Sequence, residues 1–410
     1  MREVEAMELP TGWKLTNVGD LLRFKNGLNK AKAFFGSGTP IVNYMDVFNH
    51  VGLRRSDVEG LVNVTTAEKK AFSARKGDIL FTRTSETPEE VGISTVLLED
   101  IPDAVFSGFV LRGRPVNDRL TSEFAQYCFG SRFVRDQIVS SATYTTRALT
   151  NGRILSSVKL PLPNAKQEQQ TIAAALSDAH EIESGLERLI AKKRLVKQGA
   201  MQDLLTLRRR LPGFSGEWDR ATISEVAFVD PETLGANTQK DYRFQYISLE
   251  DVSQGVLSGW TDFVFGSAPS RARRILRRGD VLLGTVRPNL KSHLLFEQDG
   301  DDWIGSTGFA VLRSRPERCV PRYLFELIMS DVIGRQIDEV IAGSNYPAIS
   351  NADVRKLNVM LPALDEQKEI SNVLSDMDAE IKTLNARLTK ARAVKEGMMQ
   401  NLLTGRIRLV

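Results

Sequence analysis

The sequence predicts a mixed α/β protein in which two similar α+β domains are separated by two long helices that form an antiparallel coiled coil with pseudo-two-fold symmetry. Three observations lead to this prediction. A long segment near the middle of the 410-residue chain recurs at its end, the apolar residues of both copies follow a coiled-coil spacing, and short motifs recur in the same order before each copy.

The repeated segment is clearest where KQGAMQDLLT, at residues 197–206, recurs as KEGMMQNLLT at residues 395–404. Extending the match backwards at the same offset pairs Glu168 with Glu366, and no gap is needed. Each copy follows a proline and contains no other proline. This pattern is typical of a helix start followed by one long, uninterrupted helix.

Apolar residues in both copies alternate in steps of four and three, which is the signature of a coiled-coil seam. Lys193 and Lys395 interrupt the two seams. An alternative interpretation is that each helix is amphipathic and packs only on its own neighbouring domain. The predicted seam residues are Ile172, Ile182, Leu186, Leu189 and Leu204 in the first helix, and Ile370, Leu374, Ile381, Leu384, Leu388 and Leu402 in the second.

The distribution of charge favours antiparallel pairing of these helices. The first part of each predicted helix is rich in Asp and Glu, and the second part is rich in Lys and Arg. Antiparallel packing places acidic residues against basic ones at both ends and opposes the helix macrodipoles. Each such surface interaction contributes only about 0.3 kcal/mol, so the argument rests on their number.

The segments that precede the two helices are weakly related to each other. They mix short β-branched or aromatic runs with Gly-Asp turns, which indicates short strands, and residues 122–138 and 321–337 look helical. We therefore expect a first domain (1–162), a first helix (163–211), a second domain (212–361) and a second helix (362–410). The matched motifs are GWKLTNVGDLL, KGDILFTRT and SGFVLRGRP in the first domain, and EWDRATISEVA, RGDVLLGTV and TGFAVLRSRP in the second.

The composition limits the possible classes of function. A hydrophobic content of 42% predicts a folded protein, and a net charge of +4 permits a polyanionic partner without requiring one. Two cysteines, Cys128 and Cys319, and three scattered histidines supply neither a disulfide framework nor a metal site. No run of 18 apolar residues and no signal-like N-terminus is found, so we expect a cytoplasmic protein without a membrane span.

Motifs for catalysis are missing from the sequence. A methyltransferase that acts on adenine by itself needs a cofactor loop and an Asn/Asp-Pro-Pro-aromatic motif, yet the only Asp-Pro pair, at Asp230, is followed by Glu232. No Gly-x-x-x-x-Gly-Lys-Ser/Thr loop for a nucleotide phosphate is found either. We therefore expect neither a methyltransferase nor an ATP-driven motor in this chain.

Together, these duplicated elements resemble the specificity subunit of type I restriction-modification enzymes. The resemblance covers essentially the whole chain and rests on helices that begin with Glu-Gln, that end with MQDLLT and MQNLLT, and that follow KLPLP and VMLP, with KGDIL and RGDVL inside the domains. It implies that each domain is a target-recognition domain for one half of a bipartite, asymmetric DNA site. The helix pair would then be the spacer between the two half-sites.

The same resemblance implies partners that carry the chemistry. Two modification (methyltransferase) subunits, which bind S-adenosylmethionine and methylate adenine, would dock on the helix pair. Restriction subunits that use ATP and Mg²⁺ would join them to form the nuclease. This chain would then bind double-stranded DNA without a catalytic residue, a metal or a cofactor of its own.

DNA contacts are expected where Arg, Lys, Asn, Thr and Tyr concentrate in predicted loops, because cations hold phosphates and planar or forked side chains read base edges. A third basic segment runs from Arg271 to Arg278. For any single residue, a solvated surface charge is an equally good interpretation. The candidates are Arg83, Thr84, Ser85, Tyr144, Thr146 and Arg147 in the first domain, and Arg287, Asn289, Lys291, Asn345 and Tyr346 in the second.

Two other functions are compatible with the sequence. The first is a protein adaptor whose coiled coil and paired domains bind other proteins and do not read DNA. The second is the recognition subunit of a restriction enzyme that cuts on both sides of its site. Sequence-selective DNA binding that weakens with salt excludes the adaptor, because phosphate contacts release counterions.

Overall fold

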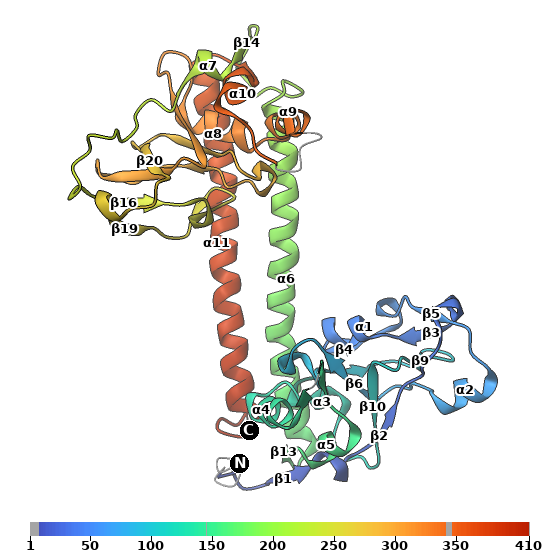
Figure 1. The fold of residues 1–410 in the computed structure, drawn as a ribbon. Helices are drawn as coiled ribbons and strands as arrows, with labels where there is room; N and C mark the ends of the chain where they lie inside the picture. The colour runs from blue at the N-terminus through green and yellow to red at the C-terminus, as the bar shows by residue number, and fades with distance from the viewer. Residues whose placement is uncertain (1–7, 145, 342–346, 410) are drawn as a thin grey trace. The chain divides into compact units, whose positions relative to one another are not determined.

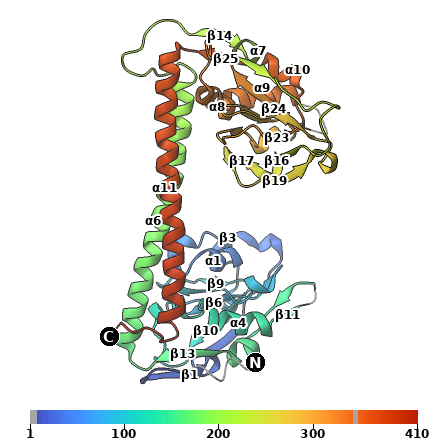
Figure 2. The same cartoon turned by 90° about the vertical axis from the view of Figure 1, so that its left-hand side faces the viewer.

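The computed structural model describes residues 8–144, 146–341 and 347–409, and it divides into two compact units (Figures 1 and 2). The first unit contains residues 1–187 and 386–410, and the second contains residues 188–385. Each unit holds one α+β domain together with part of both long helices.

The two long helices are α6 (Lys166–Leu204) and α11 (Leu364–Leu402), and each has 39 residues. Each begins shortly after a strand that ends the preceding domain, β13 (Lys159–Pro163) or β25 (Asn358–Leu361). Within each unit the two helices run antiparallel, as the sequence predicts (Figure 1).

Ion pairs in the first unit join acidic residues near the middle of α6 to basic residues in the last part of α11. Arg392 lies 3.0 Å from Glu183 and 2.6 Å from Glu187, and Lys395 lies 2.8 Å from Glu183. Lys395, which interrupts the predicted seam, therefore has an acidic partner on the facing helix. These partly exposed pairs contribute little stability each, but they favour this direction of packing over the parallel one.

In the second unit the signs of the charges are exchanged between the helices. Lys193 and Lys197 of α6 lie 2.7 Å from Glu380 and 2.6 Å from Asp378 of α11, respectively. Lys193 interrupts the other predicted seam, and it too meets a carboxylate. The prediction that acidic residues face basic residues in an antiparallel pair is confirmed in both units.

Most predicted seam residues are buried, but the predicted seam is wrong at two positions of α6. Leu189 is 39% exposed and Ile182 is 59% exposed, whereas Ile190 is only 4% exposed. The buried face steps by four residues from Leu186, because a helix with 3.6 residues per turn drifts away from a strict heptad. Ile381 is partly buried. The buried members of the predicted set are Ile172, Leu186, Leu204, Ile370, Leu374, Leu384, Leu388 and Leu402.

The ends of the helices pack into the domain cores. Ile172 and Leu402 belong to the main core of the first unit, and Leu204, Ile370 and Leu374 belong to the main core of the second. The alternative interpretation, in which each helix packs only on its own neighbouring domain, is wrong, because α11 pairs with α6 and its Leu402 packs in the core of the first unit. Each domain is fixed to its helices by apolar burial, which is the larger energetic contribution.

The domain of the first unit is built from short strands and five helices within its described residues. The main sheet has the order β2 (Leu22–Asn26), β10 (Val110–Pro115), β6 (Ile79–Thr82), β8 (Ser94–Leu97) and β4 (Gly52–Leu53). A second sheet contains β5 (Leu61–Val62), β3 (Phe35–Val42) and β9 (Val105–Phe106), and β1 (Trp13–Asn17) pairs with β13. The helices are α1 (Tyr44–Asn49), α2 (Thr66–Ala71), α3 (Ser122–Cys128), α4 (Arg132–Ser141) and α5 (Gly152–Ser157).

The domain of the second unit has two four-stranded sheets. One has the order β15 (Ala227–Val229), β24 (Phe309–Ser314), β21 (Val281–Gly284) and β22 (Leu294–Leu295), and the other has the order β19 (Thr261–Val264), β16 (Arg243–Ile247), β23 (Trp303–Ser306) and β20 (Ala272–Ile275). Two strand pairs complete it: β14 (Asp219–Thr222) with β25, and β17 (Val252–Ser253) with β18 (Val256–Leu257). Its described helices are α7 (Ile223–Val226), α8 (Pro321–Met329), α9 (Asp331–Ile341) and α10 (Asn351–Lys356).

The Gly-Asp motif has a structural role that explains its recurrence. Gly77 has a left-handed φ of 82°, and the Asp78 carboxylate accepts the Arg75 backbone N–H at 2.9 Å and forms two hydrogen bonds with Arg114. The aspartate thus closes the turn and also fixes the neighbouring strand β10. The second unit repeats this arrangement with Gly279, Asp280, Arg277 and Arg313.

Candidate nucleic-acid interface

The two predicted loops of the first unit come together in a small sheet. Its strands have the order β11 (Thr143–Tyr144), β12 (Ala148–Leu149) and β7 (Thr84–Ser85), with Ala148 opposite both Tyr144 and Ser85. The backbone N–H of Thr150 also donates to the Arg83 carbonyl at 3.0 Å. Segments that are far apart in the sequence therefore form one continuous surface.

The side chains of this surface divide into exposed and supporting groups. Tyr144 is 61% exposed, Thr146 is exposed, and the exposed Arg147 lies 3.1 Å from Glu86. Thr84 is partly buried. Tyr144, Thr146 and Arg147 are thus the predicted residues with the most surface available to a ligand.

Arg83 and Ser85 support the loop more than they project from it. The Arg83 guanidinium donates to the Gly108 carbonyl at 3.3 Å, and its Nε is buried. Ser85 is buried, its hydroxyl accepts from the Tyr44 hydroxyl at 3.2 Å, and it donates to the Glu90 carboxylate. A contact between Ser85 and DNA would require that these hydrogen bonds break.

An exposed aromatic residue that was not among the predicted contacts, Phe109, lies beside this surface. Phe109 is 57% exposed, and its carbonyl accepts the backbone N–H of Arg83 at 2.9 Å. An aromatic face of this kind suits base or sugar contacts. The signal in the sequence was its place in the matched motifs SGFVLRGRP and TGFAVLRSRP, which give no information on exposure.

In the second unit, the corresponding segments also lie side by side. Val286 bridges to Ala348, the Arg287 N–H donates to the Pro347 carbonyl at 2.8 Å, and the Ile349 N–H donates to the Thr285 carbonyl at 2.9 Å. The predicted residues Asn345 and Tyr346 lie outside the described residues. The loop after the Gly-Asp strand therefore lies beside the segment before the proline-ended strand in both units.

The loop from Arg287 to Lys291 is held in an unusual backbone conformation. Arg287 and Lys291 have left-handed φ values of 48° and 51°, and Gln254, whose N–H donates to the Lys291 carbonyl at 3.0 Å, has a φ of 48°. Such residues cost of order 1 kcal/mol each and persist where the surroundings fix them, often at functional sites. This loop is a defined surface feature, and the adjacent segment that contains Gln254 helps to fix its conformation.

The strained loop presents three exposed side chains and one anchor. Arg287 and Asn289 are exposed, and Leu290 is 57% exposed. Lys291 instead donates to the Met329 carbonyl at 3.0 Å and lies 3.6 Å from Asp331. Of the predicted residues in this loop, Arg287 and Asn289 are available to a ligand, and Lys291 is engaged with the helical segment behind it.

The turns at corresponding positions of the two units differ in chemistry. The 3₁₀ turn η4 (Pro88–Glu90) contacts α4 in the first unit, and η7 (Pro288–Leu290) contacts α9 in the second. The first turn carries two glutamates, whereas the second carries an asparagine and a leucine. The two units therefore present different surfaces on a similar scaffold.

His293 supports the loop of the second unit from inside. It is only 2% exposed, and its Nδ1 accepts the backbone N–H of Gly284 at 3.1 Å. Burial, followed by the charge of Lys291, lowers the imidazole pKa from 6.5 to about 4. The ring is therefore neutral at neutral pH, which its role as a hydrogen-bond acceptor requires.

The third predicted basic segment is mostly neutralised within the domain. Arg274 lies 2.8 Å from Asp230, Arg277 lies 3.2 Å from Glu232, and Arg278 lies 2.8 Å from Asp299. These acidic partners are distant in sequence, so the run of arginines alone did not reveal them. The segment is a weaker candidate for phosphate binding than the two loops.

Two arginines after the long helices also have structural partners. Arg210 pairs with Glu366 at 2.7 Å in the second unit, and Arg408 pairs with Glu168 at 2.7 Å in the first. Both glutamates are buried at the start of the opposite helix. These pairs fix the Glu-Gln start of each helix and explain why that motif recurs.

The described residues contain neither a metal-binding cluster nor a membrane-spanning helix. No group of three or more His, Cys, Asp or Glu side chains that could hold a metal ion occurs among them. Among the same residues, no helix has the length and apolar character needed to cross a membrane.

Comparison with known proteins identifies the family. Residues 10–192 and 217–391 each match the type I restriction modification DNA specificity domain. The chain is 20% identical to the type I restriction enzyme MjaVIII specificity subunit of Methanocaldococcus jannaschii over 429 residues, which cover all of this chain and 96% of the relative. A putative MjaX specificity subunit from the same organism is 23% identical over 437 residues, with the same coverage.

A solved structure supports the same fold. The S subunit of a type I restriction-modification system from M. genitalium is 16% identical to this chain, with a TM-score of 0.60, and the match covers 97% of this chain and 98% of that one. The chain belongs to the family of type I restriction-modification specificity subunits and contains two tandem DNA specificity domains.

Proposed function

We propose that each unit reads one half of a bipartite, asymmetric DNA site and that the helix pair sets the separation of the halves. The observation that carries this proposal is the shared pairing of two loops in both units, combined with different exposed side chains. The same scaffold positions the DNA-contacting side chains in both domains. Because these side chains differ between the two domains, the two half-sites differ in sequence.

The exposed side chains suit recognition of base edges and phosphates. In the second unit, Arg287 and Asn289 offer the forked groups that bind guanine and adenine in the major groove. In the first unit, Arg147 and Thr146 supply a cation and a hydroxyl, and Tyr144 supplies an aromatic face. Arg83, Ser85 and Lys291 then position these loops, because they are engaged with the protein.

The chain itself acts without catalysis or a bound cofactor, in the cytoplasm. Two modification subunits that bind S-adenosylmethionine dock on the α6–α11 pair, and restriction subunits that use ATP and Mg²⁺ join them. This proposal is supported by the family and by the absence of cofactor and phosphate-loop motifs from the sequence. Turnover of S-adenosylmethionine or ATP by the purified chain would contradict it.

A DNA-binding assay tests the proposed recognition of DNA. The chain is assembled with its modification subunit and mixed with a labelled duplex that carries the methylated motif of the host cell, at low and moderate salt. We expect selective binding that weakens steeply with salt. Arg287→Ala should weaken it, whereas Arg278→Ala, which removes an exposed arginine paired with Asp299, should leave it unchanged. Binding without any sequence preference would indicate an adaptor instead.

A further inference from the structure

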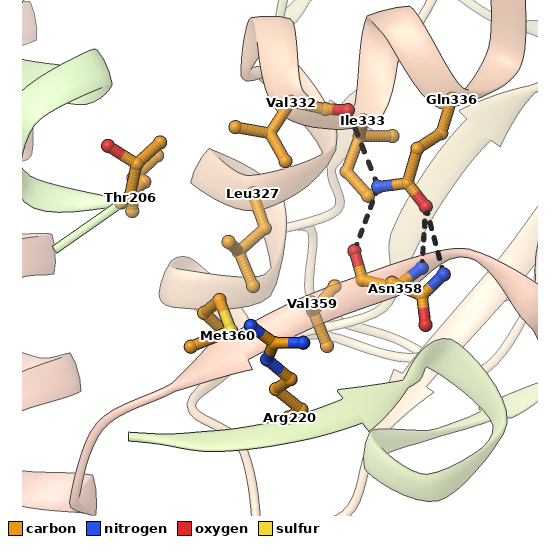
Figure 3. Close-up of a pocket in the computed structure, with 10 residues that line it drawn as sticks. Thr206, Arg220, Leu327, Val332, Ile333, Gln336, Asn358, Val359 and Met360 are labelled. Atoms are coloured by element: carbon orange, nitrogen blue, oxygen red, sulfur yellow. Dashed lines mark hydrogen bonds between the residues drawn. The ribbon is translucent and has the colours of Figure 1, made fainter. Parts of the chain in front are cut away.

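A pocket of about 290 Å³ opens beside the end of α6 in the second unit (Figure 3). Its apolar wall includes Leu327 of α8, Val332 and Ile333 of α9, and Val359 of β25. Arg220 of β14 lies at its edge, next to Met360 (Figure 3). Neither the DNA-reading loops nor the helix seam includes this pocket.

The internal repeat identifies what occupies the corresponding position in the first unit. Gln336 donates to the Val332 carbonyl at 3.4 Å and accepts the Asn358 N–H at 2.8 Å. In the first unit, Gln137 makes the same two bonds with Phe133 and Lys159, each at 2.9 Å. Val332 therefore corresponds to Phe133, whose side chain packs against the core of its own unit.

A second exchange changes the edge of the pocket. Arg220 is opposite Met360 in the β14–β25 pair, and Leu15 is opposite Pro161 in the β1–β13 pair. Met360 lies two residues after Asn358, whose N–H Gln336 binds. Pro161 likewise lies two residues after Lys159, whose N–H Gln137 binds, so Arg220 corresponds to Leu15. Where the first unit has Phe133 and Leu15, the second unit therefore has the smaller Val332 and the cationic Arg220.

The charge at this edge is unpaired among the described residues. Arg220 is the only charged residue of the pocket lining, it is exposed, and no ion pair or hydrogen bond involves its guanidinium. The amides of Gln336 and Asn358 are bound to each other and to the backbone, as Figure 3 shows. The pocket therefore offers a ligand an apolar wall and the unpaired guanidinium of Arg220.

We propose that this pocket binds an aromatic side chain of a partner protein, and that a neighbouring carboxylate of the partner pairs with Arg220. Phe133 shows that the fold accepts a benzyl group at this place, and in the second unit the partner supplies it. A buried aromatic anchor beside one charge pair is the usual core of a protein–protein contact. The pocket is a poor site for DNA, because a single arginine cannot hold a run of phosphates.

Capped dipeptides test this proposal on the full-length chain. The probes are N-acetyl-Phe-Asp-amide, N-acetyl-Phe-Lys-amide and N-acetyl-Ala-Asp-amide, and the readout is the shift of Leu327, Val332 and Ile333 methyl resonances in NMR titrations. We expect the Phe-Asp probe to bind at least roughly fivefold more tightly than the Phe-Lys probe, and the Ala-Asp probe to cause no shift. No shift with any probe, or equal affinity for the two phenylalanine probes, would overturn the proposal.

Substitutions borrowed from the first unit provide matched controls. Val332→Phe should fold, raise the unfolding temperature slightly and abolish binding, because the first unit already carries phenylalanine there. Arg220→Leu should keep the aromatic contact and lose the preference for Asp over Lys. Phe133→Val, in the first unit, should leave probe binding unchanged. Binding that survives Val332→Phe, or a probe displaced by duplex DNA, would contradict a protein-docking pocket, whereas normal DNA binding by Val332→Phe leaves the proposed function intact.

Discussion

Acidification should destabilise the second unit through His293. The buried ring accepts the Gly284 N–H through Nδ1, so protonation removes this hydrogen bond and places a charge in the interior. Burial lowers the pKa from 6.5 to about 4, so the unfolded chain binds the proton more readily than the folded one between these two values. Stability is therefore complete above about pH 6.5 and is lost as the pH falls toward 4.

The size of this effect follows from the two pKa values. Between about pH 7.5 and about pH 5, proton linkage at His293 lowers the free energy of unfolding by about 2 kcal/mol. For a unit of this size, that loss corresponds to a fall of about 4 to 8 °C in Tm. The assay is thermal and urea unfolding of the full-length chain at both pH values, followed by circular dichroism.

Two variants separate this effect from other titrating groups. His293→Asn keeps an acceptor for Gly284, and His293→Phe keeps the volume of the ring, but neither titrates in this range. Both should have a smaller pH dependence than the wild type, by about 2 kcal/mol, even if both are less stable at neutral pH. A pH dependence identical to that of the wild type would show that His293 is not buried as a neutral group.

The remaining predictions concern the helices. Leu384→Asp should lower the free energy of unfolding in urea by about 3 kcal/mol, because it places a carboxylate on a buried helix face. Leu195→Asp, at a position that is 68% exposed, should leave this free energy almost unchanged. Equal losses in the two variants would refute the buried face. Inserting seven residues after Leu186 and after Leu384 lengthens each helix by roughly 10 Å, which equals about three base pairs and a turn of about 100°. The methylated half-sites should keep their sequences and move apart, and full activity at the original spacing would show that the distance is fixed elsewhere.

The duplicated helices were the most predictable part of the fold. Their proline-free length, their Glu-Gln start and the change from acidic to basic residues along each helix are features of the local sequence, so they predicted two antiparallel helices. The structure adds the reason for the motif: buried Glu168 and Glu366 meet arginines that follow the opposite helix. Such partners are more than 150 residues away, so the sequence motif alone did not reveal them.

Individual side-chain environments were less predictable. Leu189 fits the heptad pattern as well as Leu186 does, yet Ile190 is buried in its place, because the phase of a straight helix depends on what packs against it. In the candidate interface, the sequence indicated which loops could contact DNA, but their pairing within each unit comes from the structure. The burial of Ser85 and the anchoring of Lys291 depend on tertiary neighbours that residue type does not specify.

Sequencing of methylated bases tests the central claim most directly. Cells that carry this chain with its modification subunit should methylate adenine in a motif with two defined halves separated by a fixed spacer. Tyr144→Ala should relax or change only the half read by the first unit, and Arg287→Ala only the other half. Variants that alter both halves equally, or a methylated motif that does not depend on this chain, would contradict two-domain DNA recognition.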